Sequence, residues 1–310
     1  MKEKIKQSIT NAQKFLIENK DRDNLWRDFD IRNYGILEDW ITAYTGLALA
    51  GSGVSKSFLR PIAETLANRQ NQEVGGWSCD ERVVPDTDTT AFAIMFLSDF
   101  GYDDRIHSAK DFIKKQQMPD GSFRTYQPDL IAPFISGLTS EGWSGGIPEV
   151  TATASRALGG DKKGILYLEK SALPNGGWRE YWYNKDIYVN VQGILTLKDT
   201  PSAERIVNDT KDKLLRSEAG NNPFYQSLII IGNATQQRIN LIQKNIETLL
   251  DMQREDGSWK SPEMLQFPLP PNTEPWNDPR RIHEDLYDQK RIFTTSTCLT
   301  GLSSLKELNI

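Results

Sequence analysis

Two aspartates spaced by one residue form the stretch of the chain best suited to acid chemistry. Residues 84–93 read Val-Pro-Asp-Thr-Asp-Thr-Thr-Ala-Phe-Ala, so Asp86 and Asp88 lie between a proline and an apolar run. This order is typical of the first turn of a buried helix, with Asp86 at the cap and Asp88 within that turn. Both acids can simply cap that helix and complement its dipole. The elements around them must decide between capping and chemistry.

Composition limits the classes of protein that need to be considered. With 38% hydrophobic residues among 310, the chain can bury a large core, and a net charge of -5 without a block of like charges argues against nucleic-acid binding. No apolar run approaches the roughly 20 residues of a membrane span, so we expect no stable membrane insertion. The amphipathic N-terminus is not a signal peptide, and the lone Cys79 and Cys298 favour a reduced, cytoplasmic setting. The oligomeric state is left open.

A turn containing glycine and an aromatic residue occurs four times, and each copy follows an amphipathic segment and precedes an apolar one. The copies end in Gly-Gly-Trp or Asp-Gly-Ser-Phe/Trp and span 72–77, 117–123, 173–178 and 253–259. Segments apolar on one stripe predict half-exposed helices, and segments apolar all round predict buried ones. The predicted outer helices are 2–19, 56–70, 104–117, 162–171, 202–217 and 236–253. The predicted inner helices are 38–51, 86–100, 149–159, 187–198, 222–232 and 291–306.

Six such pairs can close into an all-α (α/α)6 barrel, one domain over residues 1–310, and no strand pattern competes. Because the two sets alternate in direction, all inner helices should begin at the same rim, which we call the mouth. The longest connections, 124–147 and 260–290, should also open there. Connections of this length are usually functional or disordered, so the proline-rich 260–290 is either a lid or an unstructured loop.

The repeated turn resembles the QW motif of terpene cyclases of the squalene–hopene and oxidosqualene type, and the resemblance covers essentially the whole chain as one toroidal β domain. Residues 86–90 resemble the class II signature Asp-x-Asp-Asp in the Asp-x-Asp-Thr-Thr variant of bacterial cyclases related to drimenyl diphosphate synthases. The resemblance implies that Asp88 delivers the proton that starts cyclisation. Residues 148–153, which include Glu149 and Thr153, resemble the family's acid-Val-Thr segment.

Two families that share the toroid differ from this chain at residues that their chemistry needs. Squalene–hopene cyclases have a histidine that hydrogen-bonds the proton-donating Asp where this chain has Thr153, and they carry a second barrel, which argues against squalene as the substrate. Protein prenyltransferase β subunits share the toroid but need zinc ligands. His107 and His283 have no suitable partners in the sequence, so we expect them at the surface and expect no metal site.

A carboxyl group stays protonated at neutral pH when burial or a neighbouring carboxylate raises its pKa. For Asp88, the neighbouring Asp86 supplies a like charge and the buried helix supplies desolvation, and both raise the pKa. The helix N-terminus acts in the other direction, because it favours the ionised form. The hypothesis is that Asp86 carries the charge and Asp88 the proton, oriented by Thr89, Thr90 or Glu149. Which influence dominates cannot be read from the sequence.

Aromatic rings stabilise a carbocation by roughly 0.5–2 kcal/mol each. The turn aromatics Trp77, Phe123, Trp178 and Trp259 are interpreted as structural plugs. The candidates for the cavity lie near inner-helix starts or in rim loops and are Trp40, Tyr44, Trp143, Trp182, Tyr188 and Phe293. The cations that could bind a diphosphate, or form an ordinary solvated charge run, are Arg280, Arg281, Lys290 and Arg291. Mg²⁺ would be expected with a diphosphate, although no magnesium motif stands out.

The sequence therefore predicts a class II terpene cyclase that protonates and cyclises a hydrophobic isoprenoid. A short prenyl diphosphate such as the farnesyl or geranylgeranyl ester, with its diphosphate retained, is the expected substrate, and a meroterpenoid is the alternative. Two other classes stay open: a non-catalytic toroid that binds a prenyl group, a lipid or a protein, and a carbohydrate-active (α/α)6 enzyme with carboxylates about 5–10 Å apart. An apolar pocket favours the cyclase, a polar groove the carbohydrate enzyme, and a filled barrel the binding protein.

Overall fold

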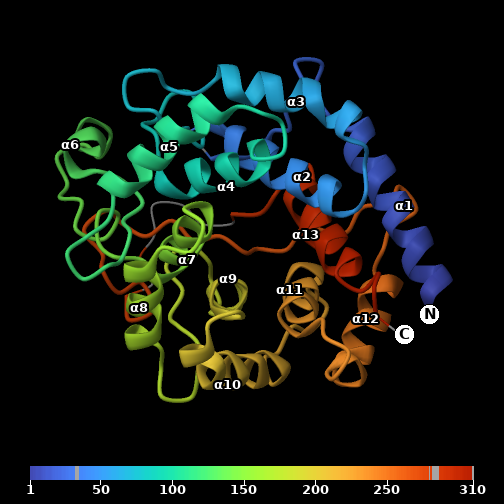
Figure 1. The fold of residues 1–310 in the computed structure, drawn as a ribbon. Helices are drawn as coiled ribbons and strands as arrows, with labels where there is room; N and C mark the ends of the chain where they lie inside the picture. Colours follow the sequence, from blue (N-terminus) through green and yellow to red (C-terminus); the bar gives the residue numbers. More distant parts are fainter. Residues whose placement is uncertain (32–34, 279, 281–285, 309–310) are drawn as a thin grey trace.

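The chain forms two concentric rings of helices in a computed structural model that describes residues 1–31, 35–278, 280 and 286–308 (Figure 1). The outer helices are α1 (Lys2–Glu18), α3 (Lys56–Asn68), α5 (Asp103–Lys115), α8 (Lys162–Ser171), α10 (Glu204–Leu215) and α12 (Gln243–Asp251). The inner helices are α2 (Asp39–Gly51), α4 (Thr87–Leu97), α7 (Pro148–Ala157), α9 (Ile187–Leu197), α11 (Pro223–Asn233) and α13 (Ile292–Ser303). Every predicted helix is present, and the predicted all-α barrel is confirmed.

The inner ring is closed by packing between its first and last members. Each inner helix packs against the next along the chain, from α2 through α4, α7, α9 and α11 to α13, and α13 returns to α2. Almost every side chain of α4 is buried, whereas α12 buries only Ile246 and Leu249. The difference matches the sequence pattern, because a helix that is covered on all sides must be apolar all round.

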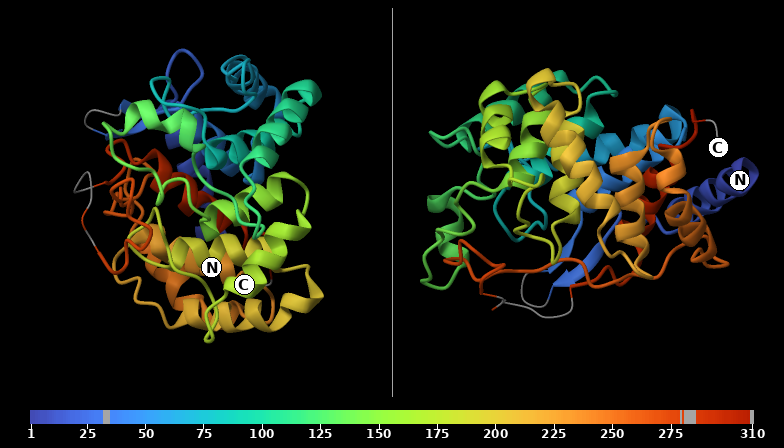
Figure 2. Two further views of the ribbon diagram at one scale, coloured as in Figure 1. Left: turned by 90° about the vertical axis from the view of Figure 1, so that its left-hand side faces the viewer. Right: turned by 90° about the horizontal axis from the view of Figure 1, so that it is seen from below.

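Additional short elements lie between the helices of the two rings. They are α6 (Pro128–Ile131), η1 (Ala132–Phe134), η2 (Pro201–Ala203), η3 (Ile239–Leu241) and the antiparallel strands β1 (Asp28–Ile31) and β2 (Gly35–Leu37). The prediction that the chain contains no strand was wrong. Three or four residues are too few to show alternation, and the register also shifts between Asp28 and Asp30. In Figure 2 (right) the hairpin, α6 and the 260s segment lie on one side of the rings.

The repeated turns fasten each outer helix to the inner helix that follows it. The indole N–H groups of Trp77, Trp178 and Trp259 donate to backbone carbonyls of the preceding outer helix at 2.7–3.0 Å, and all three rings are buried. Gly121 has φ +95°, and a Cβ there would lie 2.5 Å from the Lys163 carbonyl oxygen, so the turn needs glycine. The turn aromatics are structural plugs, as predicted.

A fifth copy of this turn was not recognised in the sequence. The Trp26 indole donates to the Leu16 carbonyl at 2.7 Å, which is the same bond that the other tryptophans make. Here Asn24 takes the left-handed conformation with φ +67°, where the later turns use glycine. Because asparagine tolerates this conformation, the turn forms without the glycine that marks the others.

The segment that follows the last turn lies across the mouth and is held there by hydrogen bonds. The Trp143 indole donates to the Pro268 carbonyl at 2.9 Å, and the backbone N–H of Gln266 donates to the Trp182 carbonyl at 2.9 Å. Leu265 forms bridges to both Tyr183 and Leu286. In the part that the structure describes, this segment is a lid rather than an unstructured loop.

Candidate active site

In the first turn of α4, three side chains of the Asp-Thr-Asp-Thr-Thr segment bond to the backbone and hold the local fold, whereas the Asp88 side chain does not. Asp86 is the N-cap, because its Oδ1 accepts the Thr89 amide at 2.7 Å and its Oδ2 accepts the Cys79 amide at 3.1 Å. The Thr87 hydroxyl donates to the Arg124 carbonyl at 2.6 Å. The Thr90 hydroxyl accepts the Trp77 amide at 2.9 Å and thereby anchors the preceding turn. The capping interpretation therefore holds for Asp86.

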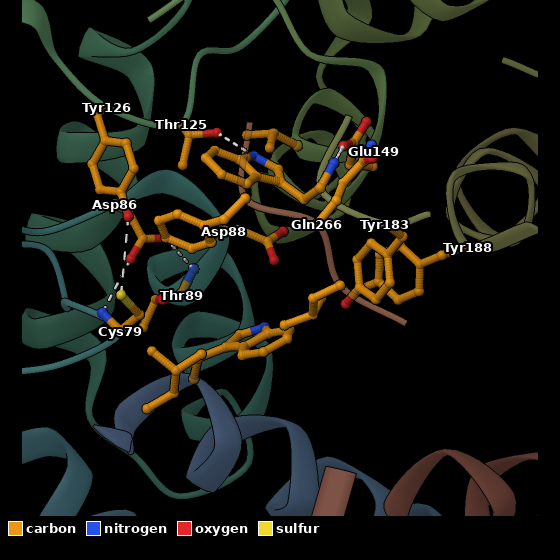
Figure 3. Close-up of a pocket in the computed structure, with 16 residues that line it drawn as sticks. Cys79, Asp86, Asp88, Thr89, Thr125, Tyr126, Glu149, Tyr183, Tyr188 and Gln266 are labelled. Atoms are coloured by element: carbon orange, nitrogen blue, oxygen red, sulfur yellow. Dashed lines mark hydrogen bonds between the residues drawn. The ribbon is translucent and has the colours of Figure 1, made fainter. Parts of the chain in front are cut away.

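Asp88 has no such structural duty, and its carboxyl lies in the pocket at the mouth. Its Oδ1 accepts a hydrogen bond of 2.6 Å from the Thr153 hydroxyl on α7. The side chain is half-buried and lines the pocket, between the Asp86 side and the Tyr183–Tyr188 pair in Figure 3. Thr153 thus gives Asp88 a hydrogen-bond donor at the position where the sequence departs from squalene–hopene cyclases.

Burial raises the pKa of Asp88 from 3.8 to about 7. The hydrogen bond from Thr153 and the more distant charge of Arg156 act against this rise, whereas the charges of Asp86 and Glu149 add to it. Burial also raises the pKa of Asp86, to about 6, and its bonds to the Thr89 and Cys79 amides limit the rise because they favour the carboxylate. Asp88 therefore holds a proton to higher pH than Asp86 does.

Two further buried carboxyl groups, Glu149 and Glu180, lie against each other beside the pocket. Glu149 Oε1 accepts the amides of Tyr181 and Trp182, both at 3.0 Å, and Glu180 Oε2 accepts the Val189 amide at 2.7 Å. A hydrogen bond joins the two carboxyl groups, and burial raises the pKa of both. One proton is therefore shared, with Glu180 as its carrier, because two adjacent buried carboxylates cannot both ionise.

The pocket contains about 630 Å³ of space between atoms, open space at its mouth included. Aromatic and aliphatic side chains form most of its wall, and no lysine or arginine of the described ranges lines it. The lid contributes Leu265, Gln266 and Phe267, of which Gln266 is labelled in Figure 3. Besides Asp88, two acids and two threonines line it among the described residues, and these are Asp86, Glu149, Thr89 and Thr125.

Half of the aromatic candidates reach this pocket. Trp40, Trp182 and Tyr188 line it, whereas Tyr44, Trp143 and Phe293 do not. Tyr44 and Phe293 pack against each other below the pocket, with ring centroids 4.4 Å apart, and Tyr44 lines a second pocket at the other end of the barrel. Trp143 lies behind Trp182, with centroids 5.7 Å apart, because its indole is drawn to the lid carbonyl of Pro268. A position near an inner N-terminus does not fix the direction of a side chain.

The three predicted cations that the structure describes do not line the pocket. Arg280 pairs with Asp278 at 2.6 Å, and Arg291 pairs with Asp256 at 2.9 Å. Lys290 is exposed, and Arg281 lies outside the described residues. Arg280 is exposed as well, and the half-buried Arg291 lies over the Phe15 ring. The solvated-charge interpretation therefore fits these residues better than a diphosphate clamp.

No group of three or more possible metal ligands comes together among the residues that the structure describes. His107 is exposed on α5 and lies 3.5 Å from Asp111, and His283 lies outside the described residues. Within the same ranges, none of the helices has the length and apolar character needed to cross a bilayer.

Several pocket residues were missed because no local pattern marks them. Tyr183 comes from the short connection before α9, and Gln266 and Phe267 come from the lid; Glu180, from the same connection as Tyr183, lies beside the pocket. Their places depend on how loops cross the mouth, which helical periodicity does not report. Arg156 lines the second pocket and could have been noticed, because an arginine on a mostly buried inner helix is unusual.

Comparison with solved structures identifies the fold as that of type II terpene cyclases. A variant of the type II terpene cyclase MstE from Scytonema, in complex with geranylgeranyl dihydroxybenzoate, matches with a TM-score of 0.87 and 20% identity over 98% of this chain and 97% of that chain. A protein from Actinoplanes matches with a TM-score of 0.86 and 23% identity over 97% and 99% of the two chains. ent-Copalyl diphosphate synthase from Streptomyces platensis matches with 0.62 and 14%, over 86% of this chain and 50% of that chain. No protein-family model and no curated protein matches the sequence.

Proposed function

We propose that this chain cyclises an isoprenoid by protonating one of its double bonds, with Asp88 as the acid. The observation that carries the proposal is the placement of Asp88 in a pocket lined mostly by aromatic and aliphatic groups, with a pKa near 7. An alkene is a weak base, so its protonation needs an acid that keeps its proton and faces little water. Asp88 meets both conditions, and the other polar side chains of its segment are engaged in holding the fold.

The neighbouring groups would act on Asp88 in two ways. Asp86 has the lower pKa of the two, so it is ionised at a pH at which Asp88 still holds its proton. The negative charge of Asp86 keeps the proton on Asp88 before the reaction. After the proton has left, the Thr153 hydroxyl donates to the new carboxylate at 2.6 Å and stabilises it. Thr153 thereby favours the state that follows proton transfer over the state that precedes it.

The ring systems around the pocket suit the carbocation that protonation creates. Trp40, Trp182, Tyr126 and Tyr188 line the space, and each face that meets the cation contributes roughly 0.5–2 kcal/mol of attraction. The lid residue Phe267 closes the same space. Aromatic faces attract the cation without offering a lone pair that would react with it, so the chain can fold and close rings before the cation is lost.

The substrate is proposed to be an isoprenoid without a diphosphate, such as a prenylated aromatic acid. MstE has been solved with geranylgeranyl dihydroxybenzoate as its substrate and with merosterolic acid A as its product, and the present chain shares its fold over nearly its whole length. Among the residues that the structure describes, the pocket wall carries no lysine or arginine that could neutralise a diphosphate. The meroterpenoid alternative is therefore favoured over the prenyl diphosphates, and no step is assigned to Mg²⁺.

The test is incubation with geranylgeranyl dihydroxybenzoate, farnesyl diphosphate and geranylgeranyl diphosphate, each with and without Mg²⁺, followed by analysis for cyclic products. Wild-type protein should cyclise the benzoate without added metal. Asp88→Asn should lower the rate about 10²–10⁴-fold, the usual contribution of a general acid. Asp111→Asn, a control on the exposed face of α5, should retain full activity. Turnover of Asp88→Asn near the wild-type rate would remove Asp88 as the acid.

A further inference from the structure

Two stacked tyrosines in the wall of the pocket carry hydroxyl groups that the surrounding protein does not satisfy. Tyr183 precedes α9 and Tyr188 lies in its first turn, and their rings are 3.9 Å apart between centroids and nearly parallel (Figure 3). Both are buried, with 3% and 1% of their surface exposed. In the part of the chain that the structure describes, neither hydroxyl has a hydrogen-bond partner other than the hydroxyl of the second tyrosine.

This pair differs from the other buried tyrosines described in the chain. The Tyr44 hydroxyl pairs with Thr297 at 3.0 Å, the Tyr181 hydroxyl donates to the Asn272 carbonyl at 2.8 Å, and the Tyr225 hydroxyl donates to Asn184. A buried hydroxyl without a partner destabilises the fold, so buried polar groups are nearly always satisfied. Two such groups side by side on the wall of one pocket indicate a site for a small polar ligand.

The position of the pair relates it to the acid. Both tyrosines line the pocket that Asp88 lines, and the negative charge of Asp88 contributes to the raised pKa of each hydroxyl. Burial is the main cause of that rise, and it keeps both hydroxyls neutral. A neutral phenol is a poor base, so the pair itself is unsuited to removing a proton from a carbocation. It can, however, donate to and accept from a water molecule.

We propose that the Tyr183–Tyr188 pair holds one water molecule that captures the carbocation after ring closure, so that the product is a cyclic alcohol. This inference rests on the proposed cyclase function and extends it to the step that ends the reaction. Trp40 lines the same pocket, and its buried indole N–H has no acceptor among the described residues, so it is a third polar group available to this water. Three polar groups are enough to hold one water in an otherwise apolar space.

The step balances without any further reagent. Asp88 gives its proton to the alkene, the chain closes its rings, and a tertiary carbocation remains beside an Asp88 carboxylate. A lone pair of the water oxygen forms the new C–O bond, and the resulting oxonium loses a proton to the Asp88 carboxylate. The sum is substrate plus water giving a cyclic alcohol, with the acid restored for the next turnover.

The direct test uses wild-type protein and geranylgeranyl dihydroxybenzoate in H₂¹⁸O, with mass spectrometry of the cyclic product. A product that is 2 Da heavier than the same alcohol made in ordinary water supports the proposal. A cyclic product that contains only an alkene, or an alcohol without ¹⁸O, overturns it while leaving the proposed cyclase function intact. If no cyclic product forms from this benzoate or from the two prenyl diphosphates, the cyclase function and this inference both fail.

Single substitutions assign the water to the pair. Tyr183→Phe and Tyr188→Phe keep the rings and each remove one hydroxyl, so each should lower the ratio of alcohol to alkene about fivefold, the value of one hydrogen bond. Tyr225→Phe, which removes a hydroxyl outside the pocket, should leave the ratio unchanged. If either pocket variant changes only KM and not the product ratio, the pair binds the substrate instead, and the proposal is wrong.

Discussion

Replacing Asp88 by asparagine should stabilise the protein at high pH, even without any substrate. Asp88 has a pKa of about 7 in the folded chain and about 3.9 when unfolded, so the folded state binds the proton more tightly. A raised folded pKa contributes stability that is fully present below the unfolded pKa and is lost as pH rises through the folded one. Asparagine is neutral at every pH and can still accept the hydrogen bond from Thr153, so the variant avoids this loss.

The magnitude follows from the two pKa values. The free energy of unfolding of the variant, relative to wild type, should rise by about 1.4 kcal/mol for each pH unit between about pH 4 and pH 7, and then stay constant. The full difference is about 4 kcal/mol. Between pH 5 and pH 8, the gap between variant and wild type should therefore widen by about 2.5 kcal/mol.

Urea unfolding of both proteins at pH 5 and pH 8, followed by circular dichroism, measures this gap. Asp111→Asn is the matched control, because the hydrogen bond from Lys114 lowers the pKa of Asp111 and the same substitution there should not stabilise the protein at pH 8. A gap between Asp88→Asn and wild type that is the same at both pH values would show that Asp88 is not held protonated, and the reasoning about its acidity would be refuted.

Further predictions concern the partner of the acid and the packing of the inner ring. Thr153→Val should raise the pKa of Asp88 by about 1–2, because the lost hydrogen bond to a charged group is worth about 1.5–3 kcal/mol. The alkaline limb of the pH–rate profile should therefore shift to higher pH. The control Thr151→Val should leave that limb in place. An unmoved limb in Thr153→Val would contradict the assignment. Gly193→Ala should destabilise the fold by about 1–3 kcal/mol in urea unfolding, because its Cβ would lie 2.2 Å from the Trp178 ring. Gly51→Ala, which meets nothing within 4 Å in α2, should not destabilise it, and equal losses in the two variants would argue against this packing.

The sequence was sufficient for the fold because its signals are local and repeated. An apolar segment such as 86–100 reports its own burial, and a turn such as 253–259 reports the helix ends on both sides. Elements whose sequence differs from the repeated pattern were not predicted. Asn24 replaces the expected glycine and hid a turn, and the strands β1 and β2 are too short to show a period.

The site was only partly predictable, because its walls come from elements that are distant in sequence. Asp86 and Asp88 could be found from their spacing, but their division into a cap and a free acid depends on the Cys79 amide and the Thr153 hydroxyl. Three of the six aromatic candidates line the pocket, because the side on which a ring emerges from its element depends on its neighbours. The lid cations were placed at the pocket by sequence proximity alone, and solvent and nearby acids hold the described ones elsewhere.

Glu180 shows most clearly what a sequence cannot report. It looks like an ordinary acid in a loop, yet the structure buries it against Glu149 and between the amides of Tyr181 and Val189. Neither carboxyl has a charged partner of opposite sign among the described residues. Only the path of the chain between α8 and α9 brings these two acids together.

Cyclisation in D₂O tests the central claim most directly. If Asp88 takes its proton from solvent and gives it to the terminal double bond, every cyclic product molecule made by wild-type protein in D₂O carries one deuterium at the former alkene carbon, and Asp88→Asn yields almost no cyclic product. A cyclic product without deuterium at that carbon, or labelled product from Asp88→Asn at the wild-type rate, would contradict the account.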